Sequence, residues 1–200
     1  MSGADLLREF ASAQCALDTK NRAELHAIGI PDIILARGLV GIARVEVSLD
    51  GKRYEPADEG HELFITPARV GLDPSTPEAT NHETVPQDGR LVDLVAWSPH
   101  YPGRWATRTG LAAWLGAIEP QFVIPPAVPI FRSPLSWLRA GAKGLCILDT
   151  NPPDIYRVLT VCQQIEAEDR AHAQQLRRIL EHPFKPPTVL VAQQRQARAA

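Results

Sequence analysis

The sequence is poor in the features that mark several large classes of protein. It has only three cysteines, Cys15, Cys146 and Cys162, at wide spacings that fit neither a disulfide framework nor a zinc site. No apolar run approaches the roughly 18 to 20 residues of a membrane helix. The N-terminus also lacks the basic and then apolar pattern of a signal peptide. We therefore expect a cytoplasmic protein with small buried thiols and no membrane association.

An excess of one charge is also missing. Lysine and arginine number 21 against 23 aspartates and glutamates, which gives a net charge of -2. This balance provides no general basic field, so any nucleic-acid site must be a local patch. The hydrophobic fraction of 44% and the charged fraction of 22% are those of an ordinary globular protein. We predict a single α+β domain over residues 1–192 and a frayed polar tail over 193–200.

The familiar catalytic and nucleotide-binding motifs are absent as well. The chain has no GxxxxGK[ST] phosphate loop, no GxGxxG fingerprint and no GxSxG elbow. Its serines have no identifiable histidine and aspartate partners. These absences favour a protein that is not an enzyme, without excluding one, and they imply no cofactor.

Helical patterns fill the first part of the chain. Residues 4–28 carry apolar side chains at three- and four-residue steps, and Asn21 can cap a second segment within them, so two helical segments are expected. Pro31 suits the first turn of a short third helix, which Gly38 would end.

From residue 45 the apolar period becomes that of a strand. Residues 45–49 alternate between apolar and polar side chains, and Asp50-Gly51 favours a tight hairpin turn. Residues 52–55 would then return antiparallel to the first strand. A third strand beginning at residues 63–65 completes a predicted antiparallel meander.

The stretch from Leu91 to Ala117 holds three of the four tryptophans. Leu91 to Trp97 is almost continuously apolar, which predicts a buried central strand. Thr109 or Gly110 would then open a short helix that Gly116 ends.

A short strand–helix–strand unit is predicted next. Val128 to Phe131 forms the first strand, Ser133-Pro134 is a well-formed helix start, and Gly141 ends that helix. Leu145 to Leu148 forms the second strand. The connection is short for a βαβ crossover, but parallel pairing is favoured.

The longest apolar stripe predicts one long C-terminal helix from Pro152 or Pro153 to Glu181, and Thr188 to Val191 predicts a final strand. The sequence thus predicts an α+β fold. Its mixed sheet combines the antiparallel N-terminal meander with a short βαβ unit, and helices pack on it.

An aromatic and basic loop over residues 99–110 is the strongest candidate binding site. Aromatic faces stack on bases and arginines bind phosphates, which suits a nucleic acid, but the same side chains dominate protein–protein hot spots. In a third interpretation the tryptophans anchor the core and the arginines pair with acids such as Asp93 and Asp169. The candidate binding residues are His100, Tyr101, Arg104, Trp105 and Arg108.

Asp169 is an anomaly in the predicted long helix. At about 100° per residue it falls in the centre of the apolar stripe, with His172 near the edge. A carboxylate that faces a core is costly unless it is paired. We expect a structural ion pair or a capping interaction. The alternatives are a kinked helix that exposes Asp169, and an iron or manganese site shared with His172.

Asp149 follows a predicted strand, where open α/β sheets often place catalytic acids. Together with Asp93 it could bind Mg²⁺, as in nucleases or phosphotransferases. An aspartate before a helix more often caps it, however, and Asp93 could face solvent. The weak candidates for metal ligands are Asp149, Asp93, Asp169 and His172.

Two segments carry a resemblance to a known family. RLVDLVAWSPHYPGRWATRTGLAAWLGAIEPQ and PIFRSPLSWLRAGAKGLCILD look similar to an uncharacterised family of bacterial proteins, loosely associated with prophages and other integrated elements. The resemblance spans roughly residues 25 to 190. It implies a bacterial cytoplasmic protein with an accessory role near DNA-handling functions, and it carries over no activity, fold or catalytic residue.

These observations favour a non-enzymatic accessory protein that binds another macromolecule through residues 99–110, with a protein as the favoured partner. A metal-dependent hydrolase or nuclease that uses Asp149, Asp93 and Asp169 is the first alternative. A nucleic-acid-binding module is the second.

Overall fold

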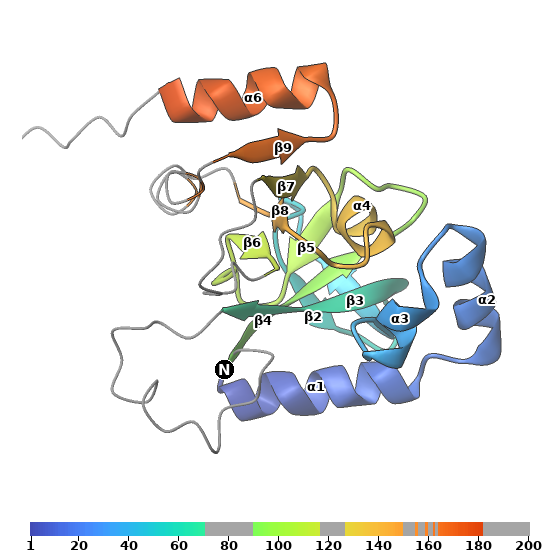
Figure 1. The fold of residues 1–200 in the computed structure, drawn as a ribbon. Coiled ribbons are helices and arrows are strands. Elements are labelled where there is room, and N and C mark those ends of the chain that lie inside the picture. The colour runs from blue at the N-terminus through green and yellow to red at the C-terminus, as the bar shows by residue number, and fades with distance from the viewer. Residues whose placement is uncertain are drawn as a thin grey trace, which may run out of the picture.

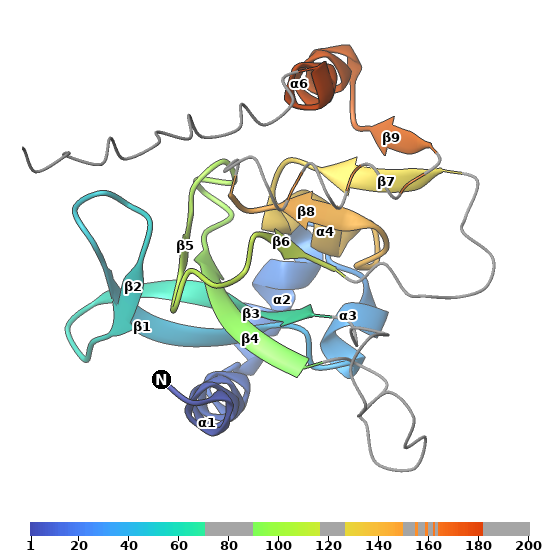
Figure 2. The same ribbon diagram turned by 90° about the vertical axis from the view of Figure 1, so that its left-hand side faces the viewer.

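A computed structural model describes residues 1–70, 90–116, 127–149 and 164–181, together with Ile155, Leu159 and Cys162. The predicted α+β class is confirmed, although the strands divide between two sheets. Helix α1 (Gly3–Cys15) covers one face of a five-stranded antiparallel sheet, and a four-stranded mixed sheet lies beyond the other face (Figures 1 and 2). Helix α6 (Arg170–Glu181) lies beside the mixed sheet, on the side away from α1.

Three helices form the N-terminal segment, as predicted. They are α1, α2 (Thr19–Ala27) and α3 (Asp32–Ala36). Helix α2 begins before Asn21, the residue that the sequence suggested as its cap. Asp18 is the N-cap of α2 and accepts the backbone N–H of Asn21, which takes the third position of a capping box.

The predicted hairpin begins the five-stranded sheet, whose order is β2-β1-β3-β4-β5 with all neighbours antiparallel. The third strand pairs with the first, not with the second as in a simple meander. The chain crosses over β1 after β2, and Gly60 lies so close to the Val45 backbone that a side chain would not fit. The strands are β1 (Gly41–Val47), β2 (Tyr54–Pro56), β3 (His61–Val70), β4 (Arg90–Trp97) and β5 (Trp105–Thr107).

The two edge strands of this sheet, β2 and β5, approach each other at one end of the sheet. The backbone N–H of Thr107 donates to the carbonyl of Lys52 at 2.9 Å, and Thr107 forms a parallel bridge with Arg53. The sheet therefore curls toward a partly closed barrel, and α1 packs against an apolar face of it.

The second sheet contains the predicted strand–helix–strand unit. Strand β7 (Val128–Phe131) and strand β8 (Leu145–Ile147) are parallel neighbours connected through α4 (Pro134–Arg139), so the parallel pairing is confirmed. Ser133 caps α4, as expected. The order is β6-β8-β7-β9, with β6 (Trp114–Leu115) and β9 (Ile165–Ala167) at the edges.

The predicted helix over residues 109–116 is wrong. The segment instead contains β6, and Leu111, expected in the core, is 75% exposed. Its backbone N–H groups near Leu111 bind the carboxylate of Asp93, so they are not available to a helical ladder. Gly110 and Gly116 also have positive φ angles.

The continuous helix to Glu181 is also wrong. Residues 165–167 form β9, which pairs in parallel with β7, and α6 begins only after Asp169. The apolar residues Ile165 and Ala167 gain backbone partners in the sheet, which a periodicity argument cannot anticipate. The predicted strand over 188–191 and the tail over 193–200 lie outside the described residues.

Three apolar clusters hold the layers together. One lies between α1 and the curled sheet, a second joins that sheet to α2, α3, α4 and β8, and a third lies between the mixed sheet and α6. Cys146 is buried but Cys15 is exposed, so the expectation of buried thiols fails for Cys15. Within the described residues, no helix is long and apolar enough to cross a membrane.

Candidate binding surface

The aromatic and basic loop divides into an inward part and an outward part. Trp105 lies in β5, and its Nε1 donates to the carbonyl of Leu148 at 3.1 Å, which ties the two sheets together. The guanidinium of Arg108 donates from Nε to Glu9 at 3.0 Å, and its side chain is only 20% exposed. These two candidates therefore have structural roles.

Arg108 belongs to a cluster that joins α1 to the curled sheet. The hydroxyl of Tyr54 donates to the other carboxylate oxygen of Glu9 at 3.1 Å, and the Arg108 guanidinium lies over the Tyr54 ring. Burial raises the pKa of Tyr54 far above its ordinary value, and the negative charge of Glu9 raises it further. The partner of Arg108 is thus Glu9, not Asp93 or Asp169.

The outward part of the loop is a turn over Ser98 to Arg104. Its backbone is held by hydrogen bonds from Tyr101 N–H to the Ser98 carbonyl and from Arg104 N–H to the Tyr101 carbonyl. The N–H of His100 also donates to the Ser98 hydroxyl at 3.3 Å. His100, Tyr101 and Arg104 are all exposed, Tyr101 by 64%. A fixed backbone that presents exposed aromatic and basic side chains suits recognition.

Asp93 does not face solvent. It is fully buried, and one carboxylate oxygen accepts the N–H groups of Leu94 and Thr109, each at 2.8 Å. The other accepts the N–H groups of Leu111 and Ala112 at 2.9 and 3.2 Å. Four backbone N–H donors therefore satisfy the hydrogen-bonding capacity of this carboxylate within the fold. The expectation that Asp93 points to solvent is wrong.

Asp169 forms the expected ion pair and cap. Both carboxylate oxygens accept bonds from Arg132 at 2.6 Å, and one also accepts the backbone N–H of His172 at 2.8 Å, at the start of α6. The Arg132 side chain lowers the pKa of Asp169 to about 2. Asp169 is half exposed and lies before α6 rather than on its apolar stripe. The ion pair and the cap are confirmed.

His172 is buried under this ion pair. Its Nδ1 accepts the backbone N–H of Glu168 at 3.3 Å, and the Glu168 carboxylate accepts the N–H of Arg132 at 2.9 Å. Burial lowers the pKa of His172, and the positive charge of Arg132 lowers it further. The cluster fastens α6 and β9 to the end of β7.

The four metal candidates are not gathered into a metal site. Asp149 follows β8, and its backbone N–H donates to the carbonyl of Ala113 at 3.2 Å. In the part of the chain that the structure describes, no group of three histidine, cysteine, aspartate or glutamate side chains could hold a metal ion. The carboxylate of Asp93 already accepts hydrogen bonds from backbone N–H groups, and that of Asp169 accepts them from an arginine.

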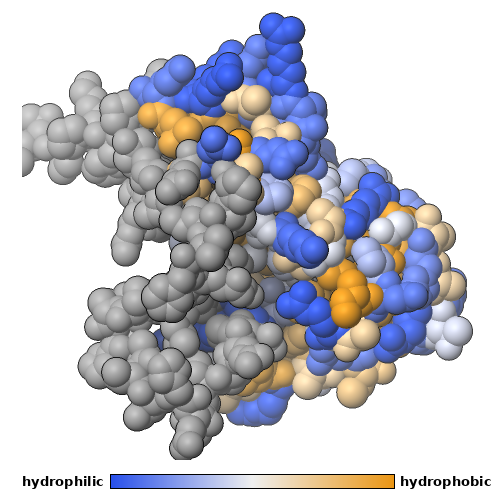
Figure 3. Space-filling view, viewed as in Figure 1, coloured by the Kyte–Doolittle hydropathy of each residue, from blue (hydrophilic) through white to orange (hydrophobic). Residues whose placement is uncertain are grey.

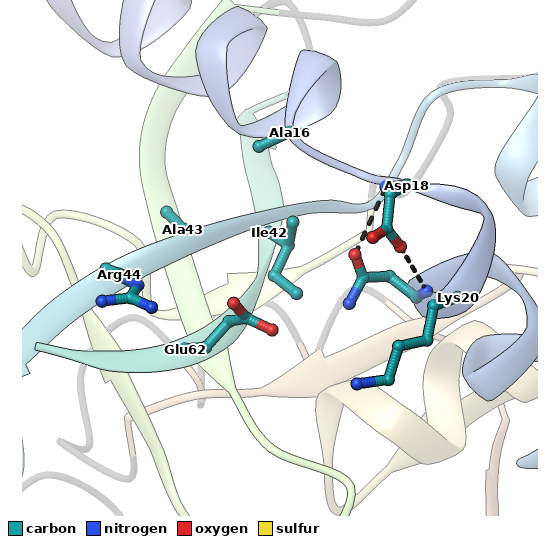
Figure 4. A pocket seen from close by; sticks show the side chains of 8 residues that line it. Ala16, Asp18, Lys20, Ile42, Ala43, Arg44 and Glu62 are labelled. Carbon is teal, nitrogen blue, oxygen red and sulfur yellow. Dashed lines mark hydrogen bonds between the residues drawn. The ribbon is translucent and has the colours of Figure 1, made fainter.

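A groove that the sequence does not predict opens beside the turn. It consists of two adjoining hollows of about 350 and about 170 Å³ that share Ile42 and Glu62. The smaller hollow is also lined by Glu24, Phe64, Trp97, Ser98, Pro99 and His100. The larger hollow is completed by Ala16, Asp18, Lys20, Asn21, Ala43 and Arg44 (Figure 4).

The groove, which we call the Glu62 groove, combines charges from three elements. Lys20 comes from α2, Arg44 from β1 and Glu62 from β3, and Figure 4 shows the Lys20 and Glu62 side chains on facing walls. Arg44 and Glu62 are register partners on neighbouring strands, but the guanidinium of Arg44 donates to the Asp58 carbonyl. Contacts across antiparallel strands bring these residues together, so no local motif could reveal the groove.

On the side shown in Figure 3, hydrophilic residues dominate and apolar residues appear only in separate patches.

Comparison with protein-family models, with curated proteins and with solved structures finds no significant match. The resemblance to a bacterial family therefore stays a prediction, and the geometry alone bears on function.

Proposed function

We propose that this protein is a non-enzymatic accessory protein of the bacterial cytoplasm that binds another protein through the turn over residues 98–104 and the adjoining Glu62 groove. The observation that carries the proposal is the exposure of Tyr101 on a hydrogen-bonded turn at the edge of a groove. Tyrosine and arginine are enriched among the residues that dominate protein interfaces.

A protein partner fits the local charge better than a nucleic acid does. Of the two loop arginines, Arg108 is paired with Glu9, which leaves Arg104 exposed. Glu24 and Glu62 line the hollow beside His100, and carboxylates there repel phosphates. The hydrolase alternative has little support, because the Asp93 carboxylate is enclosed by backbone N–H donors.

Affinity capture with matched variants tests the proposal. The full chain is used as bait in bacterial cytosol, and each retained protein is purified and titrated by calorimetry. The double variant Tyr101→Ala and Arg104→Ala should weaken a genuine partner by about tenfold to a hundredfold, which corresponds to about 1.4–2.7 kcal/mol.

The control truncates an exposed apolar residue and an exposed arginine elsewhere, as Ile33→Ala with Arg37→Ala on and beside α3. This pair should leave the affinity unchanged. Equal binding by wild type, double variant and control would contradict the proposed surface. Binding of DNA that weakens steeply with salt, with no protein partner, would favour the nucleic-acid alternative instead.

A further inference from the structure

We propose that the larger hollow of the Glu62 groove binds a small amino acid in its zwitterionic form. The carboxylate of the ligand binds at the first turn of α2, beside Lys20 and Asn21, and its ammonium group binds beside Glu62 on β3. This site goes beyond the proposed function, because its ligand is a free small molecule and not the partner protein. A buried amide and two facing charges support it.

The buried amide is the side chain of Asn21. This residue is only 8% exposed, and its Oδ1 accepts the backbone N–H of Asp18 at 3.3 Å. That bond fixes the orientation of the amide, and the two N–H groups on Nδ2 have no acceptor among the described residues. Buried donors nearly always have a partner. Asn21 lines the larger hollow and its Nδ2 is not sealed beneath the surface, so a ligand oxygen in the hollow can accept these N–H groups.

The facing charges belong to Lys20 and Glu62. Figure 4 shows their side chains on opposite walls of the hollow, and no ion pair joins them in the described part of the chain. The other two charged side chains of the lining already have partners. One Asp18 oxygen accepts a backbone N–H of α2 at 2.7 Å, and Arg44 donates to the Asp58 carbonyl. The hollow therefore presents an ammonium group and a carboxylate across a gap.

A zwitterion complements this arrangement. Lys20 and Asn21 are neighbours on the first turn of α2, so an ammonium group and an amide offer donors to one carboxylate. Glu62, on the facing wall, offers acceptors to an ammonium group. A ligand with a single charge leaves one wall unpaired, and a simple anion is also repelled by Glu62. Opposite charges within one small molecule therefore define the class of ligand.

The dimensions and lining of the hollow suit a small polar molecule. Its volume of about 350 Å³ falls within the roughly 300–1,000 Å³ that is typical of small-molecule sites. Its apolar members are Ala16, Ile42 and Ala43, and Ile42 is only 5% exposed. The hollow thus offers charge and hydrogen bonds rather than apolar surface, which favours a small amino acid over a large apolar one.

Nuclear magnetic resonance titration of the full chain tests this site. Glycine, β-alanine and γ-aminobutyrate are the zwitterionic probes, and they hold the two charges at increasing separations. Acetate and methylamine each carry one of the charges. At least one zwitterion should shift the side-chain N–H signals of Asn21 in a saturable way, with a Kd on the order of millimolar because the charge pairs are exposed. At the same ionic strength, acetate and methylamine should bind about tenfold more weakly.

Three variants each remove one recognised feature. Lys20→Met and Glu62→Gln lose a charge with little change of shape, and each should weaken binding about two- to fivefold. Asn21→Asp keeps the oxygen that accepts the Asp18 N–H but loses the donors, and should weaken binding about tenfold. Backbone signals of α2 report both binding and folding in each variant.

Matched controls remove the same charges elsewhere. Lys143→Met and Glu166→Gln alter exposed residues outside the groove and should leave the affinity unchanged.

Failure of this site and failure of the proposed function give different results. The site is overturned if none of the zwitterions gives a saturable shift, if acetate binds as tightly as they do, or if Lys20→Met and Glu62→Gln leave their binding unchanged. A peptide with internal glutamate and lysine that binds the hollow where the zwitterions do not also overturns it. The affinity of a partner for the Tyr101 and Arg104 variant is measured separately, so the proposed function can stand in each of these cases.

Discussion

At the scale of residues, distant backbone and side-chain donors decide what each acid does. The carboxylate of Asp93 binds N–H groups 16 to 19 residues later, Asp169 binds Arg132 from 37 residues away, and Glu9 binds Arg108 from 99 residues away. The predicted ion pair and cap of Asp169 are both found, but the residue lies half exposed before α6, so the reason given for them, a carboxylate on an apolar stripe, does not apply. The sequence does not identify the donors of Asp93, since backbone N–H groups carry no sequence signal.

Removing the Asp93 carboxylate should destabilise the fold. In Asp93→Ala, N–H groups of Thr109, Leu111 and Ala112 lose their acceptor, and we expect a loss of about 2–4 kcal/mol in the free energy of unfolding. Asp93→Asn keeps the shape and one good acceptor, so it should lose less. Urea unfolding measures both, and an alanine variant as stable as the asparagine variant would contradict this role.

His172 should make stability depend on pH. Its folded pKa is lowered from 6.5 by burial and by Arg132, so the fold favours the neutral form. The stabilisation is complete above about pH 6.5 and is lost as the pH falls through the lower folded pKa. Urea unfolding from about pH 7.5 to about pH 5 should show a steeper decline for the wild type than for His172→Gln. Parallel profiles would count against the assignment.

Asp169 contributes to the pH dependence in a separate, more acidic window. Its pKa is lowered from 3.8 to about 2, mainly by Arg132, so its contribution is present above pH 3.8 and is lost as the pH falls toward 2. The two windows can therefore be distinguished in one titration.

At the level of helices and strands, turn and capping signals predict structure more reliably than the spacing of apolar residues does. The hairpin at Asp50-Gly51 and the capped start of α4 are confirmed because turn and capping chemistry is local. The stretch over 109–116 has helical spacing but forms a loop and β6, since Asp93 competes for its backbone donors. Strand β9 replaces part of a predicted helix because β7 offers it parallel hydrogen bonds.

A side chain at Gly110, close to Arg53 where the curled sheet closes, should destabilise the fold. This residue has a φ of +67°, and a Cβ there would overlap the guanidinium of Arg53. Gly110→Ala should cost about 1–2 kcal/mol from the left-handed backbone, and only a little more from the overlap, because the guanidinium is the end of a flexible side chain that can move aside. A double-mutant cycle with Arg53→Ala should recover the second part and not the first. Additive effects would contradict the contact.

At the scale of the whole molecule, one apolar cluster connects the two sheets. It includes Phe64 and Trp97 from the curled sheet, Leu138 from α4 and Cys146 from β8. The groove lies on the same side of the curled sheet, where Ile42 and Phe64 are shared between the cluster and the groove. The binding surface therefore depends on the assembled layers.

The two sheets should consequently unfold together. Leu138 is fully buried between them, and Leu138→Ala should lower the free energy of unfolding by about 2–5 kcal/mol. Tryptophan fluorescence and far-ultraviolet circular dichroism should report the same transition in both proteins. Two separate transitions would indicate that the sheets are independent units.

Local signals in the chain were enough to predict the α+β class, the hairpin, the parallel strand–helix–strand unit and the aromatic and basic turn, because period, turn chemistry and capping act over a few residues. They also singled out the exposed Tyr101 and Arg104. The inward positions of Trp105 and Arg108 and the enclosure of Asp93 depend on contacts between distant segments. The Glu62 groove likewise required pairing across strands and packing of α2, contacts whose partners no spacing along the chain specifies.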